Sequence, residues 1–341
     1  MARNIYGLDL GTYQLKIYDK NKDDIRTEKN AIAVENEDTI FAVGDTAYEM
    51  YEKAPQNIEI VFPMKEGVIS RFSDMQYVLS SLLKNENGIF SRGTEYLIAV
   101  PTDVTEVEKK AFYDLVMYSA AKAREVNIVA RAVADAVGFG IDVRQADAVA
   151  IVNIGGETTD ISVLSGGGIV LNRLLKVGGA TFDHAIVNLV RHTQDFAIGR
   201  LTAEMIRKQM DVFMDKSDKS IAVAGRDLAF GRPKIEEVSI RTVRAAMKEA
   251  LDVCADSILA LLERTPPEIL SSIRRTGIYL TGGVARTNGI TEYLEGKVGL
   301  AFHTVKSPEL CVVKGLKEMI LSSELRELAY SMKDENYRWM R

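Results

Sequence analysis

Short apolar runs that lead into glycine recur along the chain and predict buried strands followed by tight turns. The run at 146–152 leads into Asn-Ile-Gly-Gly-Glu-Thr-Thr-Asp at 153–160, and a second strand is predicted at 161–164. The N-terminal segment 5–14 repeats the pattern, and a strand is predicted at 15–18. Glycine turns of this kind can direct backbone N–H groups toward an anion. We interpret the two copies as phosphate-binding hairpins, one in each half of the chain.

Apolar residues elsewhere recur at helical spacing. The longest predicted helix covers 243–263, with a period near 3.6. Further helices are predicted at 105–123, 130–140, 181–192, 203–210 and 308–321. Thr105 and Glu108 have the spacing of a capping box. Because predicted strands at 96–100, 126–129 and 278–280 alternate with these helices, the fold class is α/β with parallel βα units.

Composition narrows the functional classes. The chain has 341 residues, enough for two domains, with 47% hydrophobic and 27% charged residues, as in soluble proteins. Its net charge of −5 argues against nucleic acid as a partner. Cys254 and Cys311 fit no metal or redox spacing and are predicted to be reduced core thiols. The N-terminus leads directly into a strand and no apolar run is long enough for a bilayer, so we expect a cytoplasmic protein without a signal peptide.

The order and spacing of several motifs carry a resemblance to a known family. They lie at 7–12, 62–69, 100–108, 123–126, 225–228, 265–268 and 280–283. On these motifs the chain resembles the bacterial rod-shape protein MreB family of the actin-like ATPase superfamily, over about residues 5 to 321. The resemblance implies an actin-like fold with duplicated βββαβα units. Domain I would comprise 1–145 and 322–341, with a small subdomain at 33–63, and domain II 146–321, with a small subdomain at 181–240.

The resemblance also implies a site for ATP or ADP with Mg²⁺ between the domains. Asp9 would help to place the Mg²⁺. Glu204 and Arg207 would face the ribose and adenine, whereas their spacing alone favours a solvated pair on one helix face. The other implied nucleotide-binding residues are Gly11, Thr12, Tyr13, Gln14, Gly155, Gly156, Glu157, Thr158, Gly282, Gly283, Val284 and Ala285.

Four positions depart from the family pattern. Asn153 replaces an aspartate, and Asn cannot supply the charge that holds hydrated Mg²⁺. Glu157 and Val284 replace glycines, and Arg131 stands where the family has a glutamate that orients water. We therefore expect nucleotide binding with weak hydrolysis. The alternative is that one or two of these positions are misaligned in a working ATPase.

The function implied is a cytoskeletal protein that polymerises with itself into membrane-associated filaments and helps to set cell shape. Ile89 and Phe90 match a hydrophobic loop that the family inserts into the inner face of the membrane; alternatively, they fold back onto their own domain. One other candidate is a sugar-kinase-type phosphotransferase, which would need a carboxylate base. Another is a non-polymerising actin-like scaffold.

Overall fold

A computed structural model describes residues 4–36, 39–84, 93–119, 123–214 and 218–332. By their contacts the residues group into two units, each described by itself. Unit 1 comprises Met1–Val149, Ser162–Arg173 and Leu310–Arg341, and unit 2 comprises Ala150–Ile161 and Leu174–Glu309.

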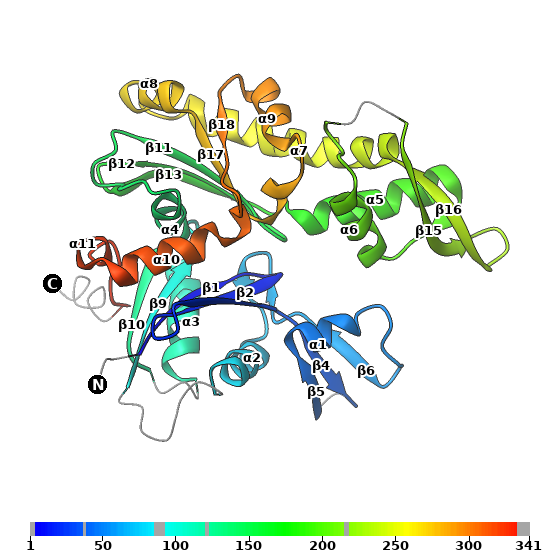
Figure 1. The fold of residues 1–341 in the computed structure, drawn as a ribbon, viewed down its shortest axis with the longest axis horizontal. Helices are drawn as coiled ribbons and strands as arrows, with labels where there is room; N and C mark the ends of the chain where they lie inside the picture. Colours follow the sequence, from blue (N-terminus) through cyan, green and yellow to red (C-terminus); the bar gives the residue numbers. More distant parts are fainter. Residues whose placement is uncertain (1–3, 37–38, 85–92, 120–122, 215–217, 333–341) are drawn as a thin grey trace. The chain divides into compact units, whose positions relative to one another are not determined.

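Unit 1 is built on a five-stranded sheet of order β10-β9-β1-β2-β3 (Figure 1). The strands are β1 (Ile5–Leu10), β2 (Gln14–Asp19), β3 (Asp24–Lys29), β9 (Thr94–Val100) and β10 (Ala123–Ala130). β1 pairs antiparallel with β2 and parallel with β9, which is parallel to β10. The predicted first hairpin is therefore present, and the buried side chains of β1 belong to the main core.

Two helix pairs cover this sheet. Helices α4 (Arg131–Gly138) and α10 (Cys311–Leu321) pack on one face, and α2 (Phe72–Lys84) and α3 (Glu106–Met117) lie on the other (Figure 1). A Cβ added to Gly315 would lie 1.8 Å from the Ala134 carbonyl oxygen, so the backbones of α10 and α4 touch. This contact explains why α10, which the sequence analysis assigned to domain II, groups with unit 1.

Helix α3 begins as predicted but is shorter. Thr105 Oγ1 accepts the Glu108 N–H, and the Glu108 carboxylate accepts the Thr105 N–H, so the predicted capping box is confirmed. The helix ends at Met117 instead of residue 123. Ala123 already pairs with Thr94 in the sheet, so β10 begins there.

Smaller elements complete unit 1. A three-stranded sheet of order β5-β4-β6 carries α1 at its side. A two-stranded ribbon, β7-β8, follows. The bounds are β4 (Ile32–Glu35), β5 (Thr39–Val43), α1 (Gly44–Glu49), β6 (Ile58–Val61), β7 (Met64–Lys65), β8 (Val68–Ile69) and α11 (Ser323–Arg326).

The second five-stranded sheet has the order β13-β12-β11-β17-β18. Its strands are β11 (Val149–Ile154), β12 (Thr159–Ser165), β13 (Gly168–Leu175), β17 (Ile278–Thr281) and β18 (Phe302–His303). β11 is parallel to β17, and β17 is parallel to β18. β11 and β12 are the two strands of the predicted second hairpin.

The helices of unit 2 pack against one another. Helix α5 (Gly179–Gln194) packs against α7 (Ile240–Glu263) and α6 (Arg200–Gln209). The long predicted helix is thus confirmed as α7, and Ser239 caps its start. The remaining elements are the sheet β14 (Phe196–Ala197), β15 (Ser220–Asp227), β16 (Pro233–Ser239), with α8 (Pro267–Thr276), η1 (Gly283–Arg286), α9 (Ile290–Val298) and η2 (Pro308–Leu310).

Candidate functional site

The first hairpin carries a buried cluster of three charges. Asp9 of β1 lies opposite Lys16 of β2 in the strand register, and Lys16 Nζ donates to Asp9 Oδ2 at 2.7 Å. Arg131, the first residue of α4, places its Nε 4.0 Å from Asp9 Oδ1. The side chains of Asp9, Lys16 and Arg131 are only 5%, 12% and 9% exposed. Two cations share one carboxylate, so the cluster carries a net positive charge.

The turn of this hairpin is held by Asn30, which follows β3. The side-chain Nδ2 of Asn30 donates to the Gly11 carbonyl at 3.0 Å, and its backbone N–H donates to the Tyr13 carbonyl at 3.1 Å. A Cβ on Gly11 would meet the Gln14 carbonyl oxygen at 2.7 Å, closer than real Cβ contacts, so only glycine fits unstrained. The turn therefore has one well-defined conformation.

Tyr13 links the same turn to the small sheet region. Lys29 Nζ donates to the Tyr13 hydroxyl at 2.6 Å and lies 3.9 Å from the centroid of its ring. The Tyr13 ring meets that of Tyr48, on α1, edge-on at 5.6 Å. Thr12 is buried, and Gln14 begins β2. The Tyr13 side chain is thus engaged by protein groups, which leaves the predicted ligand contact of this residue to its backbone.

The second turn is docked on the start of α5. The Gly155 N–H donates to the Thr158 carbonyl at 2.8 Å and closes the turn. The first N–H groups of α5 then donate to the turn, Gly179 to the Gly155 carbonyl at 3.0 Å and Ala180 to the Gly156 carbonyl at 2.7 Å. These bonds satisfy helix N–H groups that would otherwise need a cap or a ligand.

Three of the predicted nucleotide-binding segments come together at Gly179. A Cβ on Gly179 would lie 3.4 Å from Arg207 Nη2, 3.6 Å from the Gly156 oxygen and 3.6 Å from Val284 Cγ2. The second turn, α6 and the start of η1 therefore surround one point in unit 2. Gly282, just before η1, has φ of +88° and would place a Cβ 2.3 Å from the Ile154 oxygen, so it must be glycine. Val284 and Ala285 are buried, and Gly283 is exposed.

Glu204 and Arg207 do not form the solvated pair that their spacing allowed. Each is only 7% exposed, and they bind different partners. Arg207 donates to Asp183 on α5 from Nε at 2.7 Å and from Nη2 at 3.2 Å, whereas Glu204 accepts from Lys208. Burial raises the pKa of Asp183, and the hydrogen bonds from Arg207 oppose that rise. Arg207 is thereby fixed beside the second turn.

The sequence analysis missed three residues that shape these turns. Lys16 could have been found, because counting back across the first hairpin places it opposite Asp9. Asn30 and Asp183 carry no such signal, since their partners Gly11 and Arg207 lie 19 and 24 positions away on other elements.

The donor groups do not fit a resident Mg²⁺. Asp9, the predicted carboxylate for the ion, already accepts a hydrogen bond from Lys16 and lies beside Arg131. Asn153 contributes a neutral amide near Gly282. In the part of the chain that the structure describes, no group of three or more His, Cys, Asp and Glu side chains could hold a metal. Mg²⁺ prefers carboxylate-rich or phosphate-rich oxygen sites, and this cluster is cationic.

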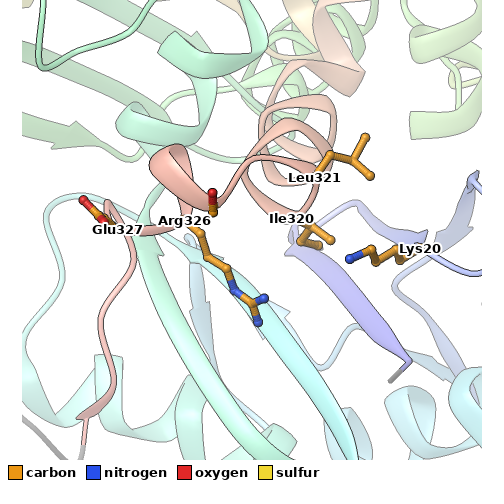
Figure 2. Close-up of a pocket in the computed structure, with 6 residues that line it drawn as sticks. Lys20, Ile320, Leu321, Arg326 and Glu327 are labelled. Carbon is orange, nitrogen blue, oxygen red and sulfur yellow. The ribbon is translucent and has the colours of Figure 1, made fainter. Parts of the chain in front are cut away.

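Other predicted features lie apart from the two turns. Ile89 and Phe90 are outside the described residues. None of the helices that the structure describes is long and apolar enough to cross a membrane. An open pocket of about 420 Å³ lies where α10 meets α11 (Figure 2). Arg326, which Figure 2 draws among the residues that line this pocket, pairs with Glu95 of β9, so its charge is already engaged.

Comparison with known proteins gives matches over nearly the whole chain. The sequence model of the MreB/Mbl protein family matches residues 3–327. The cell shape-determining protein Mbl of Bacillus subtilis (strain 168) is 34% identical over 323 residues, 94% of this chain and 96% of Mbl. The crystal structure of MreB5 of Spiroplasma citri bound to AMPPNP has a TM-score of 0.89 at 30% identity, covering 96% of this chain and 98% of that one.

A more distant structure shares the fold. The MamK double helical filament has a TM-score of 0.81 at 20% identity, covering 94% of this chain and 99% of that one. Together with the likeness to MreB5, this match confirms the predicted actin-like α/β fold.

Proposed function

The chain belongs to the MreB/Mbl protein family, and from this membership we propose that it binds ATP or ADP, polymerises into filaments and contributes to cell shape. Its relative Mbl is described as a cell shape-determining protein, and MreB5 as bound to AMPPNP. The observation that carries nucleotide binding is the meeting of the second turn, Arg207 and Val284 around Gly179. That arrangement favours binding of a nucleotide with its phosphate group at the second turn and its nucleobase beside Arg207.

Polymerisation is tested together with nucleotide binding. We expect the full chain to pellet on ultracentrifugation at high protein concentration, and ATP, ADP or AMPPNP to change the pelleted fraction. Equilibrium dialysis with each nucleotide measures binding in the same samples. A protein that binds nucleotide but stays monomeric by light scattering, with and without lipid, would be the non-polymerising scaffold instead.

Hydrolysis is proposed to be slow. A guanidinium at Arg131 cannot act as a base, and it already lies beside Asp9. Loss of a positioned acid–base group typically lowers a rate by about 10²–10⁴-fold. Arg131→Glu combined with Asn153→Asp is expected to raise phosphate release, measured with saturating ATP. Unchanged release would mean that these two positions do not limit turnover. The proposals that the protein binds nucleotide and assembles into filaments would still stand. A sugar-kinase-type phosphotransferase would also need a carboxylate base, and Arg131 does not supply one.

Membrane association is proposed from Ile89 and Phe90 in the sequence. Fully burying two large apolar side chains contributes roughly 3–6 kcal/mol, at about 1.5–3 each, part of which ordering the segment offsets. Single subunits should bind lipid weakly and filaments more strongly by avidity. Liposome co-sedimentation of wild type against Ile89→Ser with Phe90→Ser tests the idea, under conditions where both form filaments. Equal pelleting with lipid would exclude these residues as an anchor. The protein would then be cytoplasmic without a membrane contact from this segment.

A further inference from the structure

The buried charge cluster of the first hairpin has one cation more than it can balance. Asp9, Lys16 and Arg131 bring one negative and two positive charges together, with Asp9 and Arg131 under one-tenth exposed. Across the described residues, Asp9 is the one acidic partner that Lys16 and Arg131 have. An unbalanced charge with this little solvent is costly, so the cluster is best satisfied by a further anion.

The position of Arg131 adds to this imbalance. It is the first residue of α4, where the aligned peptide dipoles already produce a positive potential. The first turn of α4 contains no acidic residue. A cation at this end of a helix is unfavourable unless a negative group lies nearby, and Asp9 is shared with Lys16 at the shorter distance of 2.7 Å.

We infer that the first hairpin binds the polyphosphate of a nucleotide directly through Lys16 and Arg131, and that this binding does not require a divalent cation. The inference rests on the proposed nucleotide binding. In place of a metal between carboxylates and phosphate, the chain supplies two fixed cations, and Asp9 orients them. Ammonium and guanidinium groups are both established partners of phosphate oxygens, Lys as a point charge and Arg as a planar fork.

The experiment is isothermal titration of the full chain with ATP and with ADP, once in excess EDTA and once in excess MgCl₂. We expect the two dissociation constants for each nucleotide to agree within about tenfold, equivalent to about 1.4 kcal/mol. Binding that appears only with MgCl₂, or is more than about tenfold tighter with it, overturns the inference and leaves the proposed function standing. Absence of binding in both solutions overturns the proposed function, and the inference falls with it.

Single-residue variants identify which side chains bind the polyphosphate. A hydrogen bond to a charged group contributes about 1.5–3 kcal/mol, so Lys16→Gln and Arg131→Gln should each weaken binding in EDTA by about 10–100-fold. Each change leaves Asp9 with one cationic partner in place of two, so MgCl₂ should recover part of the loss. Lys110→Gln is the matched control: Lys110 pairs with Asp114 on the exposed face of α3 and should leave both dissociation constants unchanged.

The variants must also be folded for this comparison to hold. Circular dichroism and thermal unfolding of each variant establish that. If folded Lys16→Gln and Arg131→Gln bind nucleotide in EDTA as wild type does, the cations do not contact the polyphosphate, and the inference is wrong.

Discussion

The two glycine hairpins have matching sequences, Asp-Leu-Gly at 9–11 and Asn-Ile-Gly at 153–155, and different supports. The first turn is fixed by side chains: Asn30 binds its backbone, and Lys16 and Arg131 surround Asp9. The second turn is fixed by backbone hydrogen bonds from the first residues of α5. The same motif is thus stabilised by side chains in the first turn and by the backbone of helix α5 in the second.

This difference explains where substitution can change the chemistry. Side chains support the first turn, so a substitution there can change its charge directly, as Lys16 and Arg131 beside Asp9 illustrate. The support of the second turn depends on close backbone approach, which requires glycine at 178. Arg207, the cation beside the second turn, is paired with Asp183. The pair adds no net charge to the site, so Arg207 contributes mainly directed hydrogen-bond donors.

The largest expected effect is at Gly178. A Cβ there would lie 2.8 Å from the Glu157 C and N atoms and the Thr158 N atom, and backbone atoms cannot rotate away. Gly178→Ala should therefore lower the free energy of unfolding by about 1–3 kcal/mol, as overpacking does. Urea unfolding measures the loss. The reactivity of Cys254 reports on the local structure of the second turn, because its Sγ lies 3.7 Å from Oγ1 of Thr159, which directly follows the turn.

Two controls accompany this variant. Burial raises the pKa of Cys254 to about 11, so thiol labelling at pH 8 should be slow in wild type and faster in Gly178→Ala. Cys311, buried in unit 1 against α4, should keep its wild-type rate. Gly296→Ala, inside α9 with open space at its Cβ, should stabilise the protein by about 0.5–1 kcal/mol. Equal stability of the two alanine variants would contradict the docking of the second turn on α5.

The equivalent glycines of the two turns should respond unequally. A Cβ at Gly11 would lie 2.7 Å from the Gln14 oxygen, whereas one at Gly155 would lie 3.3 Å from the Thr158 oxygen. Gly11→Ala should cost about 1–2 kcal/mol through this overlap. Gly155→Ala should stay within about 1 kcal/mol of wild type, because a small shift relieves it and the unfolded chain loses entropy.

Urea unfolding of the two variants, analysed with equal m-values, gives this difference directly. A larger loss for Gly155→Ala than for Gly11→Ala would mean that the second turn is the tighter one, and the comparison would be reversed.

Sequence patterns predicted the parts of this structure that local chemistry determines. The period of α7, the capping box of α3 and both strand–turn–strand hairpins follow from residues near each other in the chain. The contacts that give the two turns different properties are longer in range. The pairing of Arg207 with Asp183 and the binding of Gly11 by Asn30 depend on how separate elements pack, which periodicity does not report.

Lys16 shows an intermediate case. Its role follows from the antiparallel register once the turn length is known, because Asp9 and Lys16 are directly opposed. The end of α3 was predicted six residues too late because its apolar pattern runs on toward Ala123, which the sheet recruits as the start of β10. Pairing of Ala123 in the sheet therefore determined where the helix ends, although the local apolar pattern favoured a longer helix.

The smallest expected effect is at Asn30, and it tests whether the first turn depends on a side chain. Asn30 is 1% exposed, and its Nδ2 donates to the Gly11 carbonyl. Asn30→Ala removes this bond and should cost about 1 kcal/mol in the free energy of unfolding. The loss is moderated because Asn30 Oδ1, which is buried and has no hydrogen-bond partner among the described residues, is removed as well. Nucleotide affinity in EDTA should fall by up to about tenfold, since 1.4 kcal/mol corresponds to a factor of ten and the turn would lose its fixed conformation. Asn57→Ala is the matched control: Asn57 is exposed, it also donates through Nδ2, to Glu35, and its loss should change stability by less than about 0.5 kcal/mol. Indistinguishable results for Asn30→Ala and Asn57→Ala would show that backbone contacts hold the first turn as well, and the contrast between the two hairpins would then reduce to the charges of Lys16 and Arg131.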